Sequence, residues 1–376
     1  MQSMELQIWA SGLLKRIEEK YKETVKRTAL DFFPYTVKDG RFCQADCEQG
    51  YEWWTNGFYP GILWKLFLLT GNDNYKELAK HYENLLDIPL ENFEGLHHDV
   101  GFMWLTSAVA DYRITNDSKS RKRGLHAASV LASRYNIKGN FIRAWNGEGN
   151  TGWAIIDSMM NIPILYWAAK EMDDPRFTHI AVSHADKVLE NFLRADGSVR
   201  HIVSFSAMDG SFLSELPGQG YAECSSWTRG QAWALYGFLL SYLHTGDQKY
   251  LDASKRTAHY FIAGLTGEDD DVPPCDFRSP REPVYKDTTA GAIAACGLWE
   301  LGNTVSPNEQ MLYHNSAVKI LKGIEKSCCN WNENEDGIVL YGTERYGEGI
   351  NMPIIYGDYY FLEALMKIRG NDILFW

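Results

Sequence analysis

The 376-residue sequence contains no apolar run long enough to cross a membrane, and its first 25 residues carry a charge every few positions. A secretory leader needs a basic segment followed by an unbroken apolar run, and a membrane-spanning helix needs about 20 apolar residues. We therefore expect the N-terminal segment to form an amphipathic helix, and we expect no membrane partner.

Cysteine is sparse, and its pattern suggests neither a disulfide framework nor a metal site. The seven residues are odd in number and show no paired CxxC spacing. They are Cys43, Cys47, Cys224, Cys275, Cys296, Cys328 and Cys329. Cys43 and Cys47 could in principle bind a metal, but free thiols in a reducing cytoplasm are the simpler interpretation. The sequence thus predicts a cytoplasmic protein with no metal and no cofactor.

Basic residues are outnumbered, with 37 Lys and Arg against 49 Asp and Glu, for a formal net charge of −12. Proteins that grip phosphate backbones need the opposite balance, so we expect no nucleic-acid partner. A small anionic ligand is still allowed, because one arginine or a set of helix N-termini can hold a single carboxylate.

Linker-like stretches are missing as well, since no Pro/Ser/Gly-rich or highly charged segment interrupts the chain. The residues are 45% hydrophobic and 14% aromatic, which is enough to bury one large core. We expect a single domain over residues 1–376, and the sequence leaves the oligomeric state open.

What the sequence does contain is a repeated pair of helical patterns. Five segments place apolar residues at helical spacing with charges opposite, as outward-facing helices do. They are NYKELAKHYENLL, SKSRKRGLHAASVLASRY, RFTHIAVSHADKVLENFL, YLDASKRTAHYFIAGL and NEQMLYHNSAVKILKGIE. Each follows a more apolar segment without a clear polar face, as in a buried helix. These are GFYPGILWKLFLL, GFMWLTSAVADYRI, IIDSMMNIPILYWAAK, GQAWALYGFLLSYL and TTAGAIAACGLWEL.

This alternation predicts an all-α fold, an (α/α)6 barrel. The connections TGNDNY at 70–75 and TGDQKY at 245–250 resemble one another, as in an internal repeat of helical hairpins. GDYYFLEALMKI would be the sixth inner helix, with the N-terminal helix as its outer partner. An open array would need polar caps at both ends, but the last residues, DILFW, are apolar. A closed six-hairpin toroid is therefore favoured.

If the inner helices are parallel, every loop leading into one opens at the same end of the barrel. Unusual polar and aromatic residues lie at those positions: Trp53, Trp54, His97, His98, Asp99, Asp157, Trp227, Arg229, Asp287 and Asp358. Six helix N-termini facing one mouth would also favour an anionic ligand. We therefore expect the site at this end.

Asp157 lies in the segment AIIDSMM, between Ile155, Ile156, Met159 and Met160. Apolar surroundings disfavour an ionised carboxyl, so Asp157 could donate a proton near neutral pH. Asp is also a favoured helix N-cap, and the local sequence alone does not decide between the two roles.

Asp99, in HHDVGF, has the same ambiguity, because it could cap a helix starting at Gly101. The adjacent His97 and His98 invite a metal interpretation, but they lack helical i, i+4 spacing and an obvious third ligand. We favour a role for Asp99 in holding a sugar hydroxyl, with His98 as its orienting neighbour.

The chain has 13 Trp and 21 Tyr, more than a core alone requires, and aromatic rings stack on the apolar faces of sugars. Trp54, Trp145, Trp227 and Trp233 flank Gly-containing loops at the expected mouth and are assigned to the pocket. Arg229, in SSWTRGQAW, could bind a carboxylate with two hydrogen bonds. The alternative for Arg229 is a surface ion pair.

WTNGFYPGILW, HHDVGF, IIDSMMNIP, SSWTRGQAW and YGDYYFLEAL resemble, in order and spacing, the motifs of the unsaturated glucuronyl hydrolases, glycoside hydrolase family 88. The resemblance runs from about residue 50 to the C-terminal end. It implies an (α/α)6 barrel that removes a Δ4,5-unsaturated glucuronic acid from the non-reducing end of lyase-generated oligosaccharides, such as glycosaminoglycan disaccharides. The related unsaturated rhamnogalacturonyl hydrolases share the barrel, but the HHD motif is closer to the glucuronyl branch.

The resemblance also implies residue roles. Asp157 matches the family's general acid/base and Asp99 its second essential aspartate. The substrate-contacting positions it implies are Trp54, Trp145, His201, Gln219, Arg229 and Trp233. Asp157 would protonate C4 of the vinyl ether and activate water for addition at C5, so the carboxylate spacing rule of ordinary glycosidases does not apply.

One departure concerns specificity. Relatives that prefer sulfated substrates carry a motif with Ser and Lys shortly before GDYY, whereas this chain has ERYGEGINMPIIYGDYY. A preference for sulfated disaccharides is therefore in doubt.

Two other function classes compete. Sugar 2-epimerases also use (α/α)6 barrels, but they would need paired pocket histidines, and His201 alone is suitably placed. A non-enzymatic helical-repeat scaffold would show a groove of variable exposed side chains, whereas the polar outliers here cluster at one set of helix starts.

Overall fold

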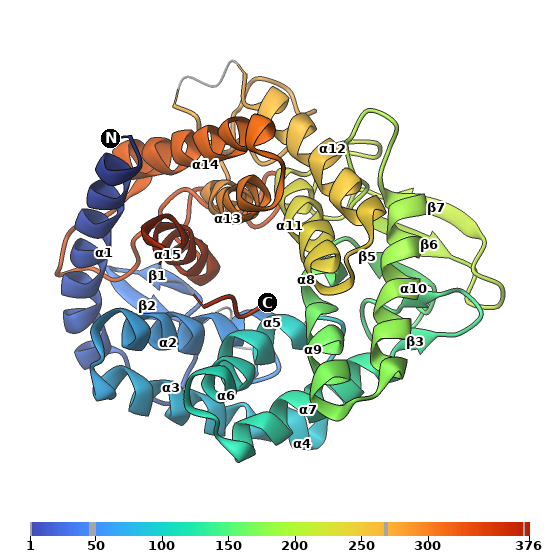
Figure 1. Cartoon of the computed structure of the whole chain (residues 1–376), viewed down its shortest axis with the longest axis horizontal. Coiled ribbons are helices and arrows are strands. Elements are labelled where there is room, and N and C mark those ends of the chain that lie inside the picture. Colours follow the sequence, from blue (N-terminus) through green and yellow to red (C-terminus); the bar gives the residue numbers. More distant parts are fainter. Residues whose placement is uncertain (1, 45–49, 267–269, 371–372) are drawn as a thin grey trace.

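Two concentric sets of helices form the molecule (Figure 1). The computed structural model describes residues 2–44, 50–266, 270–370 and 373–376. The outer helices are α1 (Gln2–Arg27), α3 (Asp73–Leu85), α7 (Ser118–Ser133), α10 (Pro175–Phe192), α12 (Gln248–Gly264) and α14 (Pro307–Cys328). Four of the inner helices are unbroken in the described residues. They are α2 (Phe58–Thr70), α11 (Thr228–Thr245), α13 (Thr288–Thr304) and α15 (Ile355–Arg369).

The ring is closed by its first and last helices. α15 packs against α13 on one side and α2 on the other, and α1 covers it from outside. This confirms the (α/α)6 fold predicted from the alternating segments, including the pairing of the N-terminal helix with the sixth inner helix. The periodicity carried this prediction, because a helix without a polar face must be buried.

The second and third inner helices are broken, which the sequence pattern did not predict. The second consists of α5 (Val100–Trp104), a π-helical stretch η2 (Leu105–Val109) and α6 (Ala110–Thr115). The third consists of α8 (Ser158–Asn161) and α9 (Pro163–Met172), and Pro163 at the first position of α9 has no N–H to donate. Both breaks lie near the barrel mouth, where the backbone can depart from regular helix geometry.

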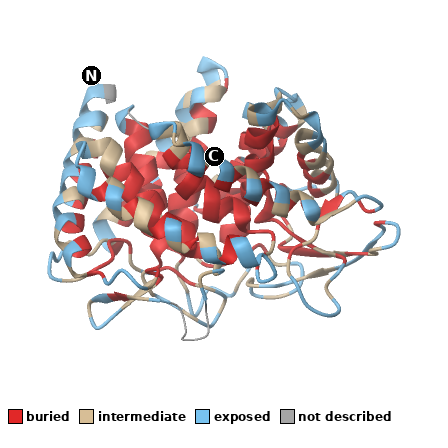
Figure 2. Cartoon of the chain, turned by 90° about the horizontal axis from the view of Figure 1, so that it is seen from below, coloured by how far each residue is buried: buried red, intermediate tan, exposed pale blue. Residues whose placement is uncertain are grey.

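Short strands line the loop end of the ring, seen at the lower side of Figure 2. β1 (Thr36–Lys38) pairs with β2 (Arg41–Cys43), and β3 (Tyr135–Asn136) with β4 (Phe141–Ile142). β5 (Trp153–Ile155), β6 (Ile202–Phe205) and β7 (Phe212–Leu216) form an antiparallel sheet. A one-turn helix η1 (Trp54–Gly57) precedes α2, and α4 (Asp87–Asn92) follows α3. These elements set the direction in which the chain enters each inner helix.

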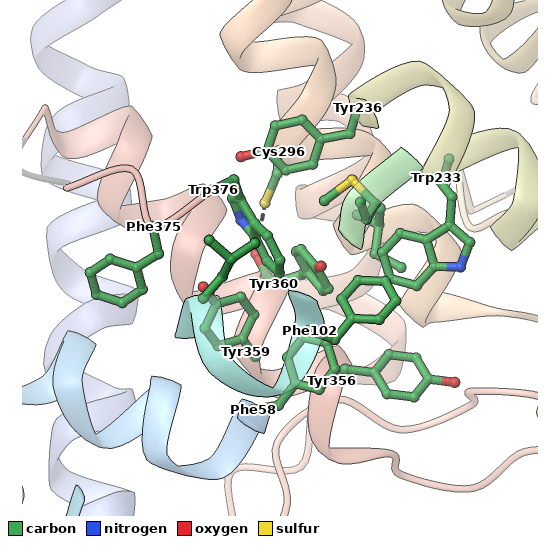
Figure 3. Packing of buried hydrophobic residues seen from close by; sticks show 14 of the residues in the cluster. Phe58, Phe102, Trp233, Tyr236, Cys296, Tyr356, Tyr359, Tyr360, Phe375 and Trp376 are labelled. Atoms are coloured by element: carbon green, nitrogen blue, oxygen red, sulfur yellow. Dashed lines mark hydrogen bonds between the residues drawn. The ribbon is translucent and has the colours of Figure 1, made fainter. Parts of the chain in front are cut away.

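The segment 373–376 fills the centre of the ring (Figure 3). The indole of Trp376 stacks on Tyr360 with centroids 5.8 Å apart, and its Nε1 donates to the buried Glu363 carboxylate at 3.1 Å. The apolar end of DILFW is thus core, although Asp372 lies outside the described residues. Within the described ranges, no helix has the length and apolarity needed to span a bilayer.

Candidate active site

Asp99 and Asp157 both sit at the N-cap positions of inner helices, yet neither side chain caps its helix in the described structure. Asp99 precedes α5 and Asp157 precedes α8. The capping interpretation considered for both carboxyls is therefore not what the structure shows, and both side chains are available for other contacts.

The start of α8 is held by hydrogen bonds that leave the Asp157 carboxyl out. The N–H of Ile142 donates to Nδ1 of His184, so Nε2 of that ring carries the hydrogen and donates to Ser158 Oγ at 2.6 Å. Ser158 in turn donates to the carbonyl of Ile155. The residue after Asp157 is therefore fixed through the buried His184.

The Asp157 side chain is buried, with 9% of its surface exposed, and its pKa is raised well above the usual range of a carboxyl. Burial is the largest cause, the nearby Asp99 charge adds to it, and Arg229 partly opposes it. Its Oδ1 atom has no hydrogen-bond partner among the described residues. A protonated carboxyl with an unpaired oxygen is the form that a general acid needs.

Asp99 has the opposite electrostatics, although it too is buried. Burial alone would raise its pKa, but His98, His97 and a hydrogen bond from Asn161 outweigh this and lower it. Its Oδ1 lies 3.2 Å from His98 Nε2, and its Oδ2 lies 3.3 Å from His97 Nδ1. One carboxyl of the pair thus favours the protonated form and the other favours the ionised form, as in acid/base pairs.

Asn161, which sequence reasoning missed, connects these two carboxyl-bearing segments. Its amide donates to Asp99 Oδ1 at 3.1 Å and to the carbonyl of Asp157 at 3.0 Å. A usable signal was present, because Asn161 follows Asp157 by four residues inside IIDSMMNIP and such residues share a helix face.

His201 lies beside Asp157 at the end of the β5–β6 sheet. Its Nδ1 contacts the N–H of Gln219 at 2.9 Å and the carbonyl of Pro217 at 3.2 Å, and its Nε2 points toward Asp157. Burial lowers the pKa of His201 to about 3, which keeps the ring neutral. Two of the predicted substrate contacts, His201 and Gln219, are therefore coupled through one hydrogen bond.

A cavity of about 770 Å³ opens at this end of the barrel. It is lined by Tyr35, Thr36, Lys38, Cys43, Gln44, Trp53, Trp54, Gln219, Arg229, Glu344, Arg345, Glu348, Met352 and Tyr356. Trp54, Gln219 and Arg229 are thus the predicted site residues in its wall. The Trp54 ring also contacts Phe102, whose N–H donates to Asn161, so this wall adjoins the carboxyl segments.

Arg229 lies in the cavity wall and is also bonded to protein groups. It is buried, and its Nη1 forms an ion pair with Asp287 at 2.6 Å. Nη1 also donates to the carbonyl of Thr343, and Nη2 donates to that of Glu344. The surface ion pair considered for Arg229 is therefore wrong, because this pair is buried, and a contact from Arg229 to a ligand carboxylate stays a prediction. Its contacts hold the 343–344 backbone in the cavity wall.

The four predicted pocket tryptophans divide into two groups. Trp54 and Trp145 are partly exposed, and Trp145 packs edge-on against His98. Trp227 is buried with its ring 4.1 Å from His201, and Trp233 is fully buried against Phe102 at 4.9 Å. Both rings are thus almost fully covered by protein groups, and the assignment of Trp227 and Trp233 to the pocket stays a prediction.

Two further aspartates expected at the mouth have structural partners. Asp287 accepts from the N–H groups of Thr289 and Ala290 and caps α13. Asp358 accepts from the backbone of Ile338 and Val339 and from the Tyr21 hydroxyl. Both side chains stabilise loops around the mouth.

His97, His98 and Asp99 offer one ligand atom each within 4.8 Å, a spacing that a metal ion would fit. The three residues are consecutive, and the group has no fourth protein ligand in the described part of the chain. His98 Nδ1 contacts the carbonyl of Ala144 at 3.1 Å, which turns Nε2 toward Asp99. The expectation of a metal-free site stays a prediction. Of the other candidate pair, Cys43 contacts the Thr36 carbonyl, and Cys47 lies outside the described residues.

Comparison with known proteins gives consistent matches. The model of Glycosyl Hydrolase Family 88 matches residues 24–240. An unsaturated glucuronyl hydrolase of Bacillus sp. (strain GL1) is 35% identical over 86% of this chain and 88% of its own length. An unsaturated chondroitin disaccharide hydrolase of Streptococcus pyogenes serotype M1 is 30% identical over 92% of this chain and 88% of its own.

A solved structure extends the comparison to the fold. An unsaturated glucuronyl hydrolase mutant of Streptococcus agalactiae, complexed with dGlcA-GalNAc6S, matches with a TM-score of 0.83 and 27% identity. The match covers 98% of this chain and 94% of that one.

Proposed function

This chain belongs to glycoside hydrolase family 88, and we propose that it removes a Δ4,5-unsaturated glucuronic acid from the non-reducing end of short, lyase-generated oligosaccharides. The relatives are named for activity on unsaturated glucuronyl and chondroitin disaccharide substrates. The observation that carries the proposal is the pair of buried carboxyls, Asp157 with a raised pKa and Asp99 with a lowered one.

The reaction is a hydration followed by ring opening. Asp157 donates its proton to C4 of the C4=C5 vinyl ether, and the resulting carboxylate takes a proton from the water that adds to C5. The product is a hemiketal at C5. Its hydroxyl proton passes to the ring oxygen as the C5–O5 bond breaks, which gives a keto group at C5 and a hemiacetal at C1. The C1 hydroxyl proton then passes to the oxygen of the neighbouring sugar, which leaves as an alcohol, and C1 becomes an aldehyde. Protons balance, because Asp157 regains the proton it gave and no oxidant or cofactor is consumed.

Asp99 supports this step in two ways. As a carboxylate it can hold ring hydroxyls, and its negative charge keeps Asp157 protonated by disfavouring a second charge nearby. The contacts to His97 and His98 fix its orientation. In this mechanism Asp157 transfers the proton and Asp99 orients the sugar.

We assign substrate contacts to Trp54, Trp145, His98, His201 and Gln219. Trp54 and Trp145 are partly exposed and can stack on sugar faces, while the polar groups can bond hydroxyls. Substrate contacts from Trp227, Trp233 and Arg229 stay predictions as well, and all three residues are buried among protein groups.

For the neighbouring sugar, we propose a preference for substrates without sulfate. The stretch before GDYY supplies Glu344, Arg345 and Glu348 to the cavity wall, and no Ser or Lys. Two carboxylates against one guanidinium make this side of the cavity unfavourable for a sulfate group. Lys38 on the opposite hairpin could still contribute a cation.

The assay is direct. The protein is incubated with unsaturated hyaluronan, chondroitin, 6-sulfated chondroitin and rhamnogalacturonan disaccharides, and the ultraviolet absorbance of the conjugated alkene is followed. We expect the absorbance to fall with a glucuronyl disaccharide, fastest with an unsulfated one, and equally after dialysis against a chelator. If no unsaturated uronide loses its absorbance, the proposal fails and an epimerase or a binding scaffold moves ahead. A rhamnogalacturonan preference would move the chain to the related branch.

We also propose a reducing compartment for the protein. Among the described residues, Cys43, Cys224, Cys275, Cys328 and Cys329 form no disulfide, and Cys275 and Cys328 are buried. Activity that is unchanged by a thiol reductant would support a cytoplasmic location.

A further inference from the structure

Asn161 occupies the point where the two catalytic segments touch. Gly101 of α5 lies so close that a Cβ added there would come within 2.4 Å of the Asn161 Cα and carbonyl oxygen. The backbones of α5 and α8 are therefore in direct contact, and glycine is required at 101 for this approach. The Asn161 side chain is fully buried at this contact.

The hydrogen bonds of Asn161 fix the orientation of its amide. The N–H of Phe102 donates to Oδ1 at 2.7 Å, and because that atom must accept, the amide nitrogen faces the other way. The two hydrogens of Nδ2 then reach Asp99 Oδ1 at 3.1 Å and the Asp157 carbonyl at 3.0 Å. A single side chain thus bonds both catalytic segments and the first turn of α5.

We propose that Asn161 is a positioning residue for the proposed hydration, joining the Asp99 carboxylate to the backbone of Asp157 through one amide. This inference rests on the proposed function and adds a residue to it. The donor at Asp99 Oδ1 stabilises the ionised carboxylate. The ionised carboxylate, in turn, favours the protonated form of Asp157. Asn161 therefore influences the protonation states of Asp99 and Asp157 without touching the substrate.

Other charged groups facing the pair set the background for this effect. Asp99 faces His97 and His98 from its own loop, Arg134 from the end of the following outer helix, and Asp157 from α8. None of these contacts depends on Asn161, so removing the amide leaves them in place.

Asp157 faces Asp99, Arg229 and His201. Its carboxyl does not touch the Asn161 side chain, which bonds the Asp157 carbonyl instead. A change at Asn161 should therefore reach Asp157 chiefly through Asp99.

The test compares Asn161→Leu and Asn161→Ala with a matched control, Gln231→Leu. Gln231 is a fully buried amide on α11 that accepts from the Val199 N–H and donates to the Gly197 carbonyl, away from the carboxyl pair. Asn161→Ala removes the donor to Asp99 without adding a charge and is smaller than Leu, so it serves if the Leu variant fails to fold.

We expect both Asn161 variants to move the acidic limb of the kcat against pH profile upward by about one pH unit, because Asp99 loses a charge-stabilising donor. At neutral pH Asp99 stays ionised in either case, so kcat should fall much less there than on the acidic limb, with a smaller change in KM. Gln231→Leu should lower the Tm and leave the acidic limb where it is. An acidic limb that is unmoved in a folded Asn161 variant, or moved equally in Gln231→Leu, would overturn the proposal.

A second readout separates this inference from the proposed function. The Asp99 carboxyl carbon can be titrated by NMR in the wild type and in Asn161→Ala without any substrate. An upward shift in the midpoint supports the role of Asn161 even if no unsaturated uronide is hydrolysed. An unchanged midpoint contradicts it even if the enzyme is active.

Discussion

His201 Nε2 faces Asp157 Oδ1 across 4.0 Å, and neither atom has a hydrogen-bond partner among the described residues. The opposite ring nitrogen, Nδ1, contacts the Gln219 N–H at 2.9 Å and the Pro217 carbonyl at 3.2 Å, which orients Nε2 toward the carboxyl. Because 4.0 Å is too long for a direct hydrogen bond, the two groups are held close without engaging one another. The Asp157 oxygen is thus left free to meet a reacting atom.

Changing Asp157 to Asn should nearly abolish turnover while the fold persists. The amide keeps the shape of the carboxyl but has no acidic proton to give, and loss of general acid/base catalysis costs about a hundredfold to ten-thousandfold. Steady-state kinetics on an unsaturated disaccharide measures this. Asp252→Asn, at an exposed aspartate of outer helix α12, is the control and should behave as wild type. Turnover near wild type in Asp157→Asn would remove this residue from the mechanism.

Activity should fall on the alkaline side as Asp157 loses its proton. Its pKa is raised by burial and by the Asp99 charge, so the loss should occur at a pH well above the usual carboxyl range. In Asp99→Asn the alkaline limb of the residual activity should move to lower pH, because removing the neighbouring negative charge lowers the pKa of Asp157. Profiles of kcat/KM against pH measure both limbs. An alkaline limb that stays in place in Asp99→Asn contradicts the coupling.

Arg229→Ala should lower the free energy of unfolding of the protein, whatever its effect on substrate binding. It leaves the Asp287 carboxylate buried without its partner, a change that costs about 3–5 kcal/mol. The double variant Arg229→Ala/Asp287→Asn removes the stranded charge, keeps an N-cap for α13 and should recover part of the loss. Urea unfolding compares the three proteins. Equal stability of the single and double variants would show that the ion pair is not the cause.

A second buried carboxyl predicts a pH-dependent stability. Glu83 accepts from Trp64 Nε1, and its Oε2 lies 3.0 Å from Ser120 Oγ and 3.3 Å from Arg123 Nη1. Burial, followed by the nearby Asp111, raises its pKa to about 8, although Trp64 and Arg123 act in the opposite direction. The folded state then holds a proton that the unfolded chain releases above its own lower pKa. Glu83 therefore destabilises the fold increasingly as the pH rises toward 8.

Glu83→Gln keeps the shape and removes this penalty. The free energy of unfolding of Glu83→Gln minus that of wild type should rise by on the order of 2–3 kcal/mol from pH 5 to pH 7. Urea unfolding at the two pH values gives the difference. A stability difference that is the same at both pH values would mean that Glu83 is ionised in the folded protein.

The fold could be predicted closely because its signal is local. Apolar residues at helical spacing mark which helices face outward, and segments without a polar face mark the inner ones. The breaks at η2 and at Pro163 escaped prediction, since they depend on neighbouring helices. Thr106, for example, donates from within η2 to the carbonyl of Gly57, which lies 49 positions away.

The candidate site was predicted in part. The chemistry of Asp157 follows from its apolar neighbours in the sequence, and the structure adds Asp99 as a second cause. The ion pair of Arg229 with Asp287 was not predicted, because the two residues lie 58 positions apart. Asn161 was missed because its role exists only where α5 and α8 meet. The contacts assigned to substrate remain predictions.

The sequence by itself determined the helical hairpins, their order, and the apolar neighbours of Asp157 along the chain, because these depend on residues within a few turns of each other. Only the tertiary structure decided which polar groups meet: Asp99 with Asn161 across 62 positions, and Arg229 with Asp287 across 58. The physical reason is that a buried polar group must find a partner. Which partner it finds depends on how closed-ring packing brings distant helix starts together at one mouth.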